Sequence, residues 1–252
     1  MKWWDTRCLS FGGAQVPYGF HEEAKIEEAK QRRTGEQIAC IPEETEALRG
    51  LGLVNRELVR ELGRRCGEQR IATVDQDATI IESRKQEALR AYEGERGYQP
   101  MSAVWAERNV VLADEFRDGN VPAMMAPLRV AKQSYAALPE TVKEYYFRGD
   151  SACHESQLIN WLRNEEREEG PRGFIGFAIS ARMSGALHKE IVRIPEEGWQ
   201  AYGKEHAKQI RECAEVSFVP ERNRNTKTHS RCAMWRYEYD RGKKPCLRMA
   251  AR

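Results

Sequence analysis

The amino-acid sequence predicts an α/β fold in which three antiparallel strands, a helix and a parallel fourth strand form a mixed sheet. The first observation is the order of elements over residues 71–166, which runs strand, strand, strand, helix, strand, helix. The second is length, because 252 residues suffice to bury a sizeable core in one large or two small domains. The third is composition, since 40% hydrophobic and 32% charged residues are typical of a globular protein.

Helices are predicted before the sheet, in an N-terminal helical region over residues 1–70. Within residues 20–33, Glu28 and Arg32 are four positions apart and can pair on one helix face. Residues 43–62 carry apolar side chains at helical spacing. These side chains are Ala47, Leu51, Val54, Leu58 and Leu62.

The predicted sheet begins with strands at residues 71–81, 98–106 and 110–116. A short polar turn separates the second strand from the third, so these two are expected to form a hairpin. The polar segment at 117–120 and Pro122 then end the run of strands. We therefore expect the three strands to form an antiparallel meander.

A helical crossover is predicted to lead to the fourth strand. Apolar residues at 128, 131, 135 and 138 have helical spacing, and Pro139 ends this helix. The fourth strand covers residues 145–150 and runs into a helix at about 154–166. Because a crossover of this length can return the chain to the starting end of the sheet, the fourth strand can lie parallel to the first.

The C-terminal third is predicted to contain an α+β segment at 171–220 and a basic tail at 221–252. The expected elements are strands at 174–179, 216–219 and 232–239 and a helix at 185–193. The tail carries ten Lys or Arg against three Asp or Glu, a net charge of +7, in a chain whose total is only +2. Such a tail is expected to bind a polyanion or simply to be solvated.

Composition also excludes several classes of protein. No apolar run of about 18 residues is present, so no membrane partner is expected. The first residues lack the apolar stretch of a secretory signal, which favours a cytoplasmic location. The seven cysteines include no C-x-x-C pair, so we expect reduced cysteines rather than a disulfide framework or a zinc site.

Acidic side chains on the first and fourth strands are the candidate site. Asp75 and Asp77 share one face of the first strand by alternation, and Asp150 ends the fourth strand. If these strands are neighbours, Asp77 and Asp150 come within reach of each other. Two such carboxylates suit Mg²⁺, which binds one or two carboxylates plus substrate phosphates. The competing interpretation is that Asp150 only caps the following helix.

Five segments are similar, in order, to segments of the DDE transposases of bacterial insertion sequences (the group 1 type of transposase DDE domain). TVDQDATIIE (73–82) resembles that family's first catalytic segment, and FRGDSAC (147–153) resembles its second. The other three are YEGERGYQP (92–100), DEFRDGNVP (114–122) and GFAIS (176–180). The resemblance covers roughly residues 20–220 and implies a ribonuclease-H-like catalytic core at 71–170.

The resemblance also implies an activity and a site. The family's first acid falls on Asp77, with Asp75 as the runner-up, and the second falls on Asp150. Together they would hold two Mg²⁺ or Mn²⁺ ions for in-line attack on a phosphodiester. The implied reaction is strand cleavage at element ends followed by strand transfer. The implied partner is double-stranded DNA (element ends and target), with a homodimer left open and a nucleoid-associated location.

The family's third acid is a Glu in the pattern Tyr-x₂-Arg-x₃-Glu, and the C-terminal part of this sequence does not contain that pattern. Tyr237 and Tyr239 lack the Arg, and no acid follows Asp240. The N-terminal region is also shorter than in the family. We therefore expect a chain truncated at both ends, an inactive or partial copy that retains two of the three acids.

Three further residues are predicted to contact DNA. Arg148 shares a face with Asp150 by alternation, so it is expected to hold a phosphate or, preferably, to pair with that Asp. Arg117 and Asn120 lie in the polar loop after the third strand, where a turn role is the competing interpretation. The alternatives for the whole chain are a DNA-binding remnant without catalysis, another metal nuclease of the same fold, and a structural domain.

Overall fold

The computed structural model describes residues 39, 41, 44–85, 88–181, 183–201, 211–218, 230–237 and 249–251. The chain divides into two compact units, Met1–Val54 and Asn55–Arg252, and each is described by itself. The predicted helix at 20–33 lies outside the described residues. Nearly all the described elements belong to the second unit.

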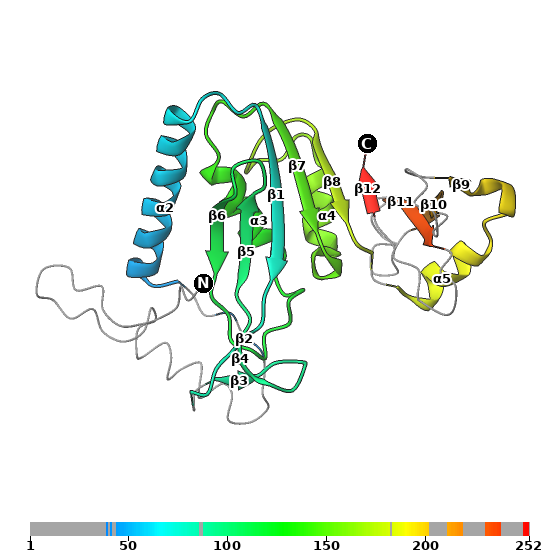
Figure 1. The fold of residues 1–252 in the computed structure, drawn as a ribbon, viewed down its shortest axis with the longest axis horizontal. Helices are drawn as coiled ribbons and strands as arrows, with labels where there is room; N and C mark the ends of the chain where they lie inside the picture. Colours follow the sequence, from blue (N-terminus) through cyan, green and yellow to red (C-terminus); the bar gives the residue numbers. More distant parts are fainter. Residues whose placement is uncertain are drawn as a thin grey trace, which may run out of the picture. The chain divides into compact units, whose positions relative to one another are not determined.

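A mixed sheet with the strand order β12-β8-β7-β1-β5-β6 is the centre of the second unit (Figure 1). Its strands are β1 (Ile71–Ala78), β5 (Met101–Trp105), β6 (Val110–Glu115), β7 (Glu144–Gly149), β8 (Ile175–Ile179) and β12 (Met249–Ala251). β1, β5 and β6 form the predicted antiparallel meander. β7 lies parallel to β1 and β8 parallel to β7, while β12 is antiparallel to β8. The predicted parallel pairing of the fourth strand with the first is confirmed.

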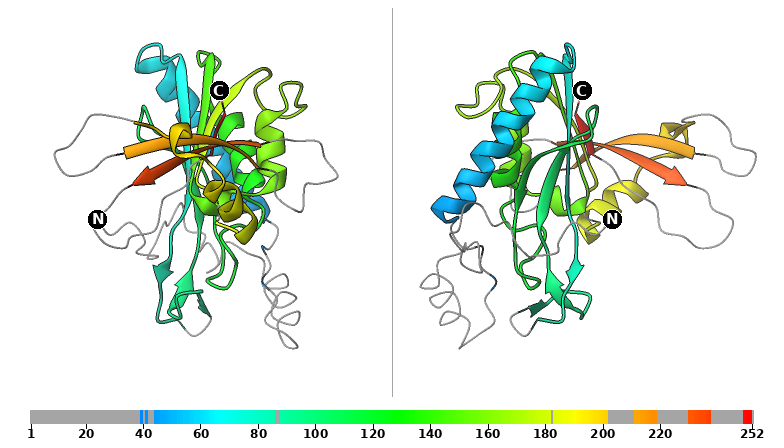
Figure 2. Two further views of the ribbon diagram at one scale, coloured as in Figure 1. Left: turned by 90° about the vertical axis from the view of Figure 1, so that its right-hand side faces the viewer. Right: turned by 60° about the vertical axis from the view of Figure 1, so that its left-hand side comes forward.

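A second, small sheet with the order β2-β4-β3 lies beyond the ends of β1 and β5 (Figures 1 and 2). Its strands are β2 (Ile81–Glu82), β3 (Leu89–Arg90) and β4 (Arg96–Tyr98). The sequence predicted one strand at 71–81 and one at 98–106, and each is interrupted. The pairing of β1 with β5 ends next to Pro100, which has no backbone N–H to donate. Thr79 donates its backbone N–H to the Pro100 carbonyl at 3.1 Å. β3 was not predicted.

The helices after the meander cover one face of the large sheet (Figure 2). They are α3 (Pro127–Ala137) and α4 (Ser156–Arg163), preceded by a 3₁₀ turn at Ser151–Cys153. α3 contacts β1, β5, β6 and α4, and α4 contacts β8. Pro127 begins α3, where its missing N–H is not needed. The helix predicted at 154–166 is shorter, because Glu155 caps its start by accepting from the N–H groups of Gln157 and Leu158.

The core lies between this sheet face and the two helices. Val74 and Phe147 are completely buried on β1 and β7, and Leu158 is completely buried on α4. Gln76 shares the buried face of β1, and its Nε2 donates to the carbonyl of Pro127 at 2.9 Å. The inner face of β1 is therefore fixed against the start of α3.

Helix α2 (Glu46–Arg65) crosses the boundary between the two units, and its C-terminal half packs within the second. Asn55 Nδ2 donates to the carbonyls of Val111 and Leu112 in β6, at 3.2 and 3.1 Å. The predicted apolar stripe is not the buried face, because Leu58 is 64% exposed whereas Val59 is buried.

The C-terminal elements form a further sheet with the order β11-β10-β9. They are α5 (Gly185–Val192), β9 (Gln200–Ala201), β10 (Arg211–Phe218) and β11 (Ser230–Tyr237). β10 and β11 pair antiparallel along eight positions, so β11 places part of the predicted basic tail in a sheet. None of the helices in the described ranges is long and apolar enough to cross a membrane.

Replacing Gly149 by Ala is expected to destabilise the fold. A Cβ there would lie 2.7 Å from the Cys153 Cβ and 2.8 Å from its Sγ. Such overpacking costs about 1–3 kcal/mol of unfolding free energy. The measurement is the urea midpoint, with Gly185→Ala as the matched control because no atom lies within 4 Å of the added Cβ there. Equal midpoints for the two variants would contradict the prediction.

Candidate functional site

The parallel pairing of β1 with β7 brings the predicted acids to one edge of the sheet. In the observed register Asp75 lies opposite Arg148 and Gln76 opposite Gly149. The next positions are Asp77 on β1 and Asp150, directly after β7. Because hydrogen-bonded strands are about 4.8 Å apart, these two residues occupy adjacent backbone positions. Both are exposed, at the C-terminal ends of their strands.

Alternation along β1 separates an apolar layer from a polar one. Ala72, Val74 and Gln76 are buried, whereas Asp75 is half-buried and Asp77 exposed. The predicted sharing of one face by Asp75 and Asp77 agrees with this burial pattern.

Asp75 is neutralised by Arg148 across the β1–β7 pair. The Arg148 Nε and Nη2 groups donate to Asp75 Oδ1 and Oδ2, a bidentate ion pair. The hydrogen bond to Asp75 raises the pKa of the Arg148 guanidinium. Arg148 was expected to pair with Asp150, and this is corrected: its partner is Asp75, because the register places Asp75 directly opposite it.

Asp77 and Asp150 are oriented by local backbone groups instead. Ala78 donates its N–H to Asp77 Oδ1 at 2.9 Å, and Ala152 donates its N–H to Asp150 Oδ1 at 2.8 Å. The second bond caps the 3₁₀ turn Ser151–Cys153, whereas Glu155 caps the following helix α4, so Asp150 does not cap that helix. Within the described part of the chain, neither carboxylate has a Lys, Arg or His partner. One oxygen of each carboxylate is thus fixed while the negative charge stays uncompensated.

A buried thiol lies beneath the two acids, and the sequence did not single it out as part of the site. Cys153 is completely buried, and its Sγ contacts the carbonyl of Gln76 at 3.8 Å. Burial, together with the negative charges of Asp150 and Asp77, raises the pKa of the Cys153 thiol to about 12. Both acids therefore lie within electrostatic reach of one thiol, which stays protonated at neutral pH.

The predicted DNA contact by Arg117 is wrong. Its side chain is completely buried; Nε donates to Glu115 Oε1 at 2.7 Å and Nη1 donates to the Met125 carbonyl at 2.8 Å. Burial lowers the pKa of this guanidinium. Arg117 and Glu115 are two apart in an extended segment, a spacing that puts both on one face and could have indicated the pair.

The predicted DNA contact by Asn120 stays a prediction. This residue is half-buried, and the Val121 N–H donates to the Asp118 carbonyl at 3.0 Å, which forms the turn of the competing interpretation. No group of three or more His, Cys, Asp or Glu side chains that could hold a metal ion is found among the residues described.

Among solved structures, a DNA transposase is similar to this chain at low sequence identity. No protein-family model matches the chain, and no curated protein matches it. A piggyBac transposase, solved in a synaptic complex with hairpin DNA, is similar with a TM-score of 0.38 and 11% sequence identity. The similarity covers 72% of this chain and 33% of the transposase chain, so this chain spans about one third of that protein's length.

Cys153 is expected to resist alkylation at pH 8 in the folded chain. With a thiol pKa of about 12, only about one molecule in 10⁴ carries the thiolate that reacts. Cys66 is the control, because it is exposed. Iodoacetamide labelling followed by peptide mass spectrometry should find Cys66 modified and Cys153 modified only after unfolding. Similar labelling rates for the two cysteines in the native chain would refute the buried position.

Proposed function

We propose that this chain is the catalytic core of a DDE-type DNA transposase, in which Asp77 and Asp150 are two of the catalytic acids. The observation that carries the proposal is the juxtaposition of these uncompensated carboxylates at the C-terminal ends of adjacent parallel strands. Ligand sites of open α/β sheets collect at such strand ends. Without a ligand of positive charge, two neighbouring carboxylates repel each other, so the arrangement favours cation binding.

The architecture supports the same proposal. The order β6-β5-β1-β7-β8, with three antiparallel strands followed by two parallel ones, is compatible with a ribonuclease-H-like fold. The resemblance of segments 73–82 and 147–153 to the catalytic segments of insertion-sequence transposases adds to it. These segments contain β1 with Asp77 and the end of β7 with Asp150.

The residues present fit a hard divalent cation. Carboxylate oxygens are the protein ligands that Mg²⁺ and Mn²⁺ prefer, and Mg²⁺ commonly needs only one or two of them beside substrate phosphates. Asp77 and Asp150 would hold the metal, since the N–H groups of Ala78 and Ala152 bind only one oxygen of each. When bound, two such ions activate an attacking hydroxyl and stabilise the leaving oxygen of a phosphodiester. The protein's part is to hold the two carboxylates in fixed orientations, with no Lys, Arg or His side chain of the described residues paired to them.

The Asp75–Arg148 ion pair favours Asp77 over Asp75 as the first acid. Both oxygens of Asp75 accept from Arg148, so a metal would have to compete with a guanidinium for them. The ion pair of Arg148 with Asp75 instead links β7 to β1 next to the two acids. A positive side chain at this place also lowers the repulsion between the acidic edge and a DNA phosphate.

We expect Asp77→Asn and Asp150→Asn to lower Mn²⁺ affinity by about tenfold or more, because each removes a charged ligand. Asp75→Asn should change it by less than about threefold, since an exposed ion pair contributes little. Asp114→Asn is the matched control, because Asp114 is exposed on β6, two strands from β1. Mn²⁺ binding is followed by electron paramagnetic resonance.

Catalysis is tested with the same four variants. Nicking of a supercoiled plasmid in Mg²⁺ or Mn²⁺ reports phosphodiester cleavage, and joining of a labelled 3′-hydroxyl oligonucleotide to the plasmid reports strand transfer. Nicking without joining would favour a metal nuclease of the same fold. Metal-independent DNA binding without either reaction would favour a non-catalytic DNA-binding protein, and loss of Mn²⁺ binding in Asp75→Asn alone would contradict the assignment of Asp77.

A further inference from the structure

A row of four polar side chains crosses the large sheet at the end where β1, β7 and β8 stop and β5 starts. Asp77 lies directly opposite Ser102 of β5. On the other side β7 is paired with β8, and the Ser180 N–H continues this ladder by donating to the Gly149 carbonyl at 3.1 Å. Ser180 therefore lies beside Asp150, as Ser102 lies beside Asp77. We call these four residues, Ser102, Asp77, Asp150 and Ser180, the strand-end row.

Alternation along the strands places both serines of the row on the face that carries the acids. Met101 and Ala103 on β5 are completely buried, whereas Ser102 between them is half-buried. Ile179 on β8 is completely buried, whereas the next residue, Ser180, is half-buried. Because successive side chains of a strand project to opposite faces, both hydroxyls lie on the outer face, away from the core.

The acids occupy the middle of the strand-end row, and a hydroxyl lies at each end. Hydrogen-bonded strands are about 4.8 Å apart, so the four positions span about 14 Å. Directly opposed Cβ atoms of an antiparallel pair are about 4.5–5.5 Å apart, which puts the Ser102 side chain next to the Asp77 carboxylate. A group bound at the two acids thus has one hydroxyl on each side of it.

The two hydroxyls suit a phosphate beside a metal site. Neither serine side chain makes a hydrogen bond within the described ranges, and a hydroxyl can donate one hydrogen bond. Because a hydroxyl carries no charge, it offers a donor to a phosphate oxygen without competing with a cation for the carboxylates. An arginine at either position would pair with the neighbouring acid, as Arg148 does with Asp75.

The outer face behind the row is accessible on the β8 side. In the register of β7 with β8, Arg148 lies opposite Ala178, two residues before Ser180. The Arg148 side chain is 58% exposed although it binds Asp75, and Ala178 contributes only a methyl group beside it. A polyanion that approaches Ser180 over Ala178 therefore meets an exposed guanidinium before it reaches the acids.

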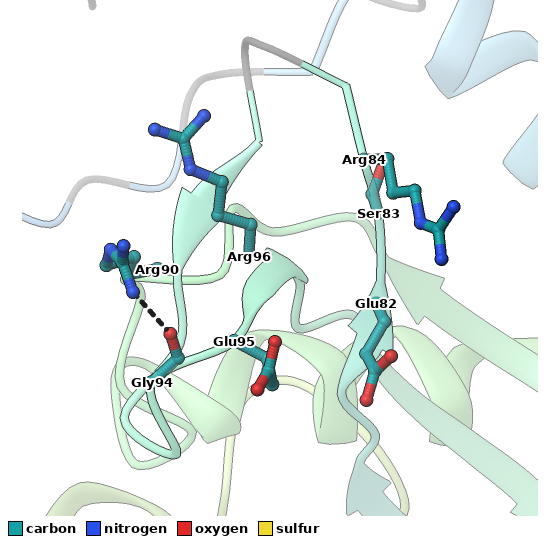
Figure 3. A pocket seen from close by; sticks show the side chains of 7 residues that line it. All are labelled: Glu82, Ser83, Arg84, Arg90, Gly94, Glu95 and Arg96. Atoms are coloured by element: carbon teal, nitrogen blue, oxygen red, sulfur yellow. Dashed lines mark hydrogen bonds between the residues drawn. The ribbon is translucent and has the colours of Figure 1, made fainter.

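The arginines of the small sheet do not converge on one phosphate. A polar hollow of about 510 Å³ there is lined by Arg84, Arg90 and Arg96 among others (Figure 3). Arg84 directly follows Ser83, whose N–H donates to the Arg96 carbonyl, so Arg84 projects to the other face of the sheet. Arg90 Nη1 donates to the Gly94 carbonyl at 2.8 Å. The serines of the strand-end row are therefore the better-placed donors for a phosphate next to the acids.

We propose that Ser102 and Ser180 donate hydrogen bonds to the two DNA phosphates that flank the scissile phosphodiester held at Asp77 and Asp150. The inference rests on the proposed function and deepens it, because it states how the substrate strand lies across the site. The row of about 14 Å is as long as about four steps of 3.4 Å along one DNA strand, so phosphates on both sides of the scissile one are within its reach. Such contacts position the backbone without reading its sequence.

The test is DNA binding by the full chain in Ca²⁺, a cation that also binds carboxylate oxygens. Fluorescence anisotropy of a labelled 30-base-pair duplex is recorded over a series of KCl concentrations, and a gel confirms that the duplex stays uncut. Ser102→Ala and Ser180→Ala are each expected to weaken binding about fivefold at 0.15 M KCl, the effect of one lost hydrogen bond to a charged group. The salt slope should stay unchanged, because no cationic side chain is lost.

Three controls separate a phosphate contact from a structural role. Thr141→Val removes a hydroxyl just before β7, at the opposite end of the sheet, and should bind DNA like the wild type. Ser102→Thr and Ser180→Thr keep the hydroxyl and should bind within about twofold of the wild type. Mn²⁺ affinity, measured by electron paramagnetic resonance without DNA, should change less than twofold in the alanine variants, because the serines are not metal ligands.

Each outcome decides between this inference and the proposed function. DNA affinities of the alanine variants equal to that of Thr141→Val overturn the phosphate contacts, and if the wild type still nicks plasmid DNA, the proposed function stands. Threonine variants as weak as the alanine ones, a parallel loss of Mn²⁺ affinity, or a wild type that binds no DNA also overturn them. Weaker binding by the alanine variants alone supports the contacts even if nicking is never seen, an outcome that counts only against the proposed function. Thermal melting by circular dichroism checks each fold, and an alanine variant that melts lower is replaced by the corresponding cysteine.

Discussion

The parallel pairing of β1 with β7 in one register is the constraint on which the candidate site depends. A slip of one residue would turn each side chain of a strand to the other face. Three contacts oppose such a slip. Val74 and Phe147 are buried opposite each other in the core, Asp75 binds Arg148 on the outer face, and Gly149 leaves room for Cys153. Two of these contacts lie in the core and one on the outer face, so core packing and surface charge specify the same alignment.

The same register divides the acids into two kinds. Asp75 faces a guanidinium on the neighbouring strand, whereas Asp77 and Asp150 extend past the last residue pair of that ladder. Carboxylates at the end of a ladder find only backbone N–H groups, which fix their orientation without cancelling their charge. The strand ends thus concentrate negative charge, although the chemistry of the three side chains is identical.

Much of this arrangement could be predicted from the sequence, because it follows from long-range order and alternation. The order of the elements and the two-residue alternation of side chains along a strand are enough to predict the meander and the crossover. They are also enough to predict that Asp77 and Asp150 lie close together. The partner of Arg148 could not be predicted, since alternation gives the face but not the register. The sequence does not indicate the small sheet, because strands of two or three residues have no detectable period. It does not indicate the burial of Arg117 either, because a polar loop is expected to be exposed.

Arg117 illustrates how a buried ion pair serves positioning rather than stability. Glu115 accepts from both Arg117 and Arg129, and Arg117 also binds the carbonyl of Met125. Burying such charges seldom adds net stability, but removing one partner leaves an uncompensated charge inside the protein. The backbone of the same Arg117 accepts from the Gln99 N–H at 2.9 Å, at the junction of β4 and β5. The network therefore anchors the loop after β6, whose Gly119 N–H donates to the Gly97 carbonyl of the small sheet at 3.1 Å.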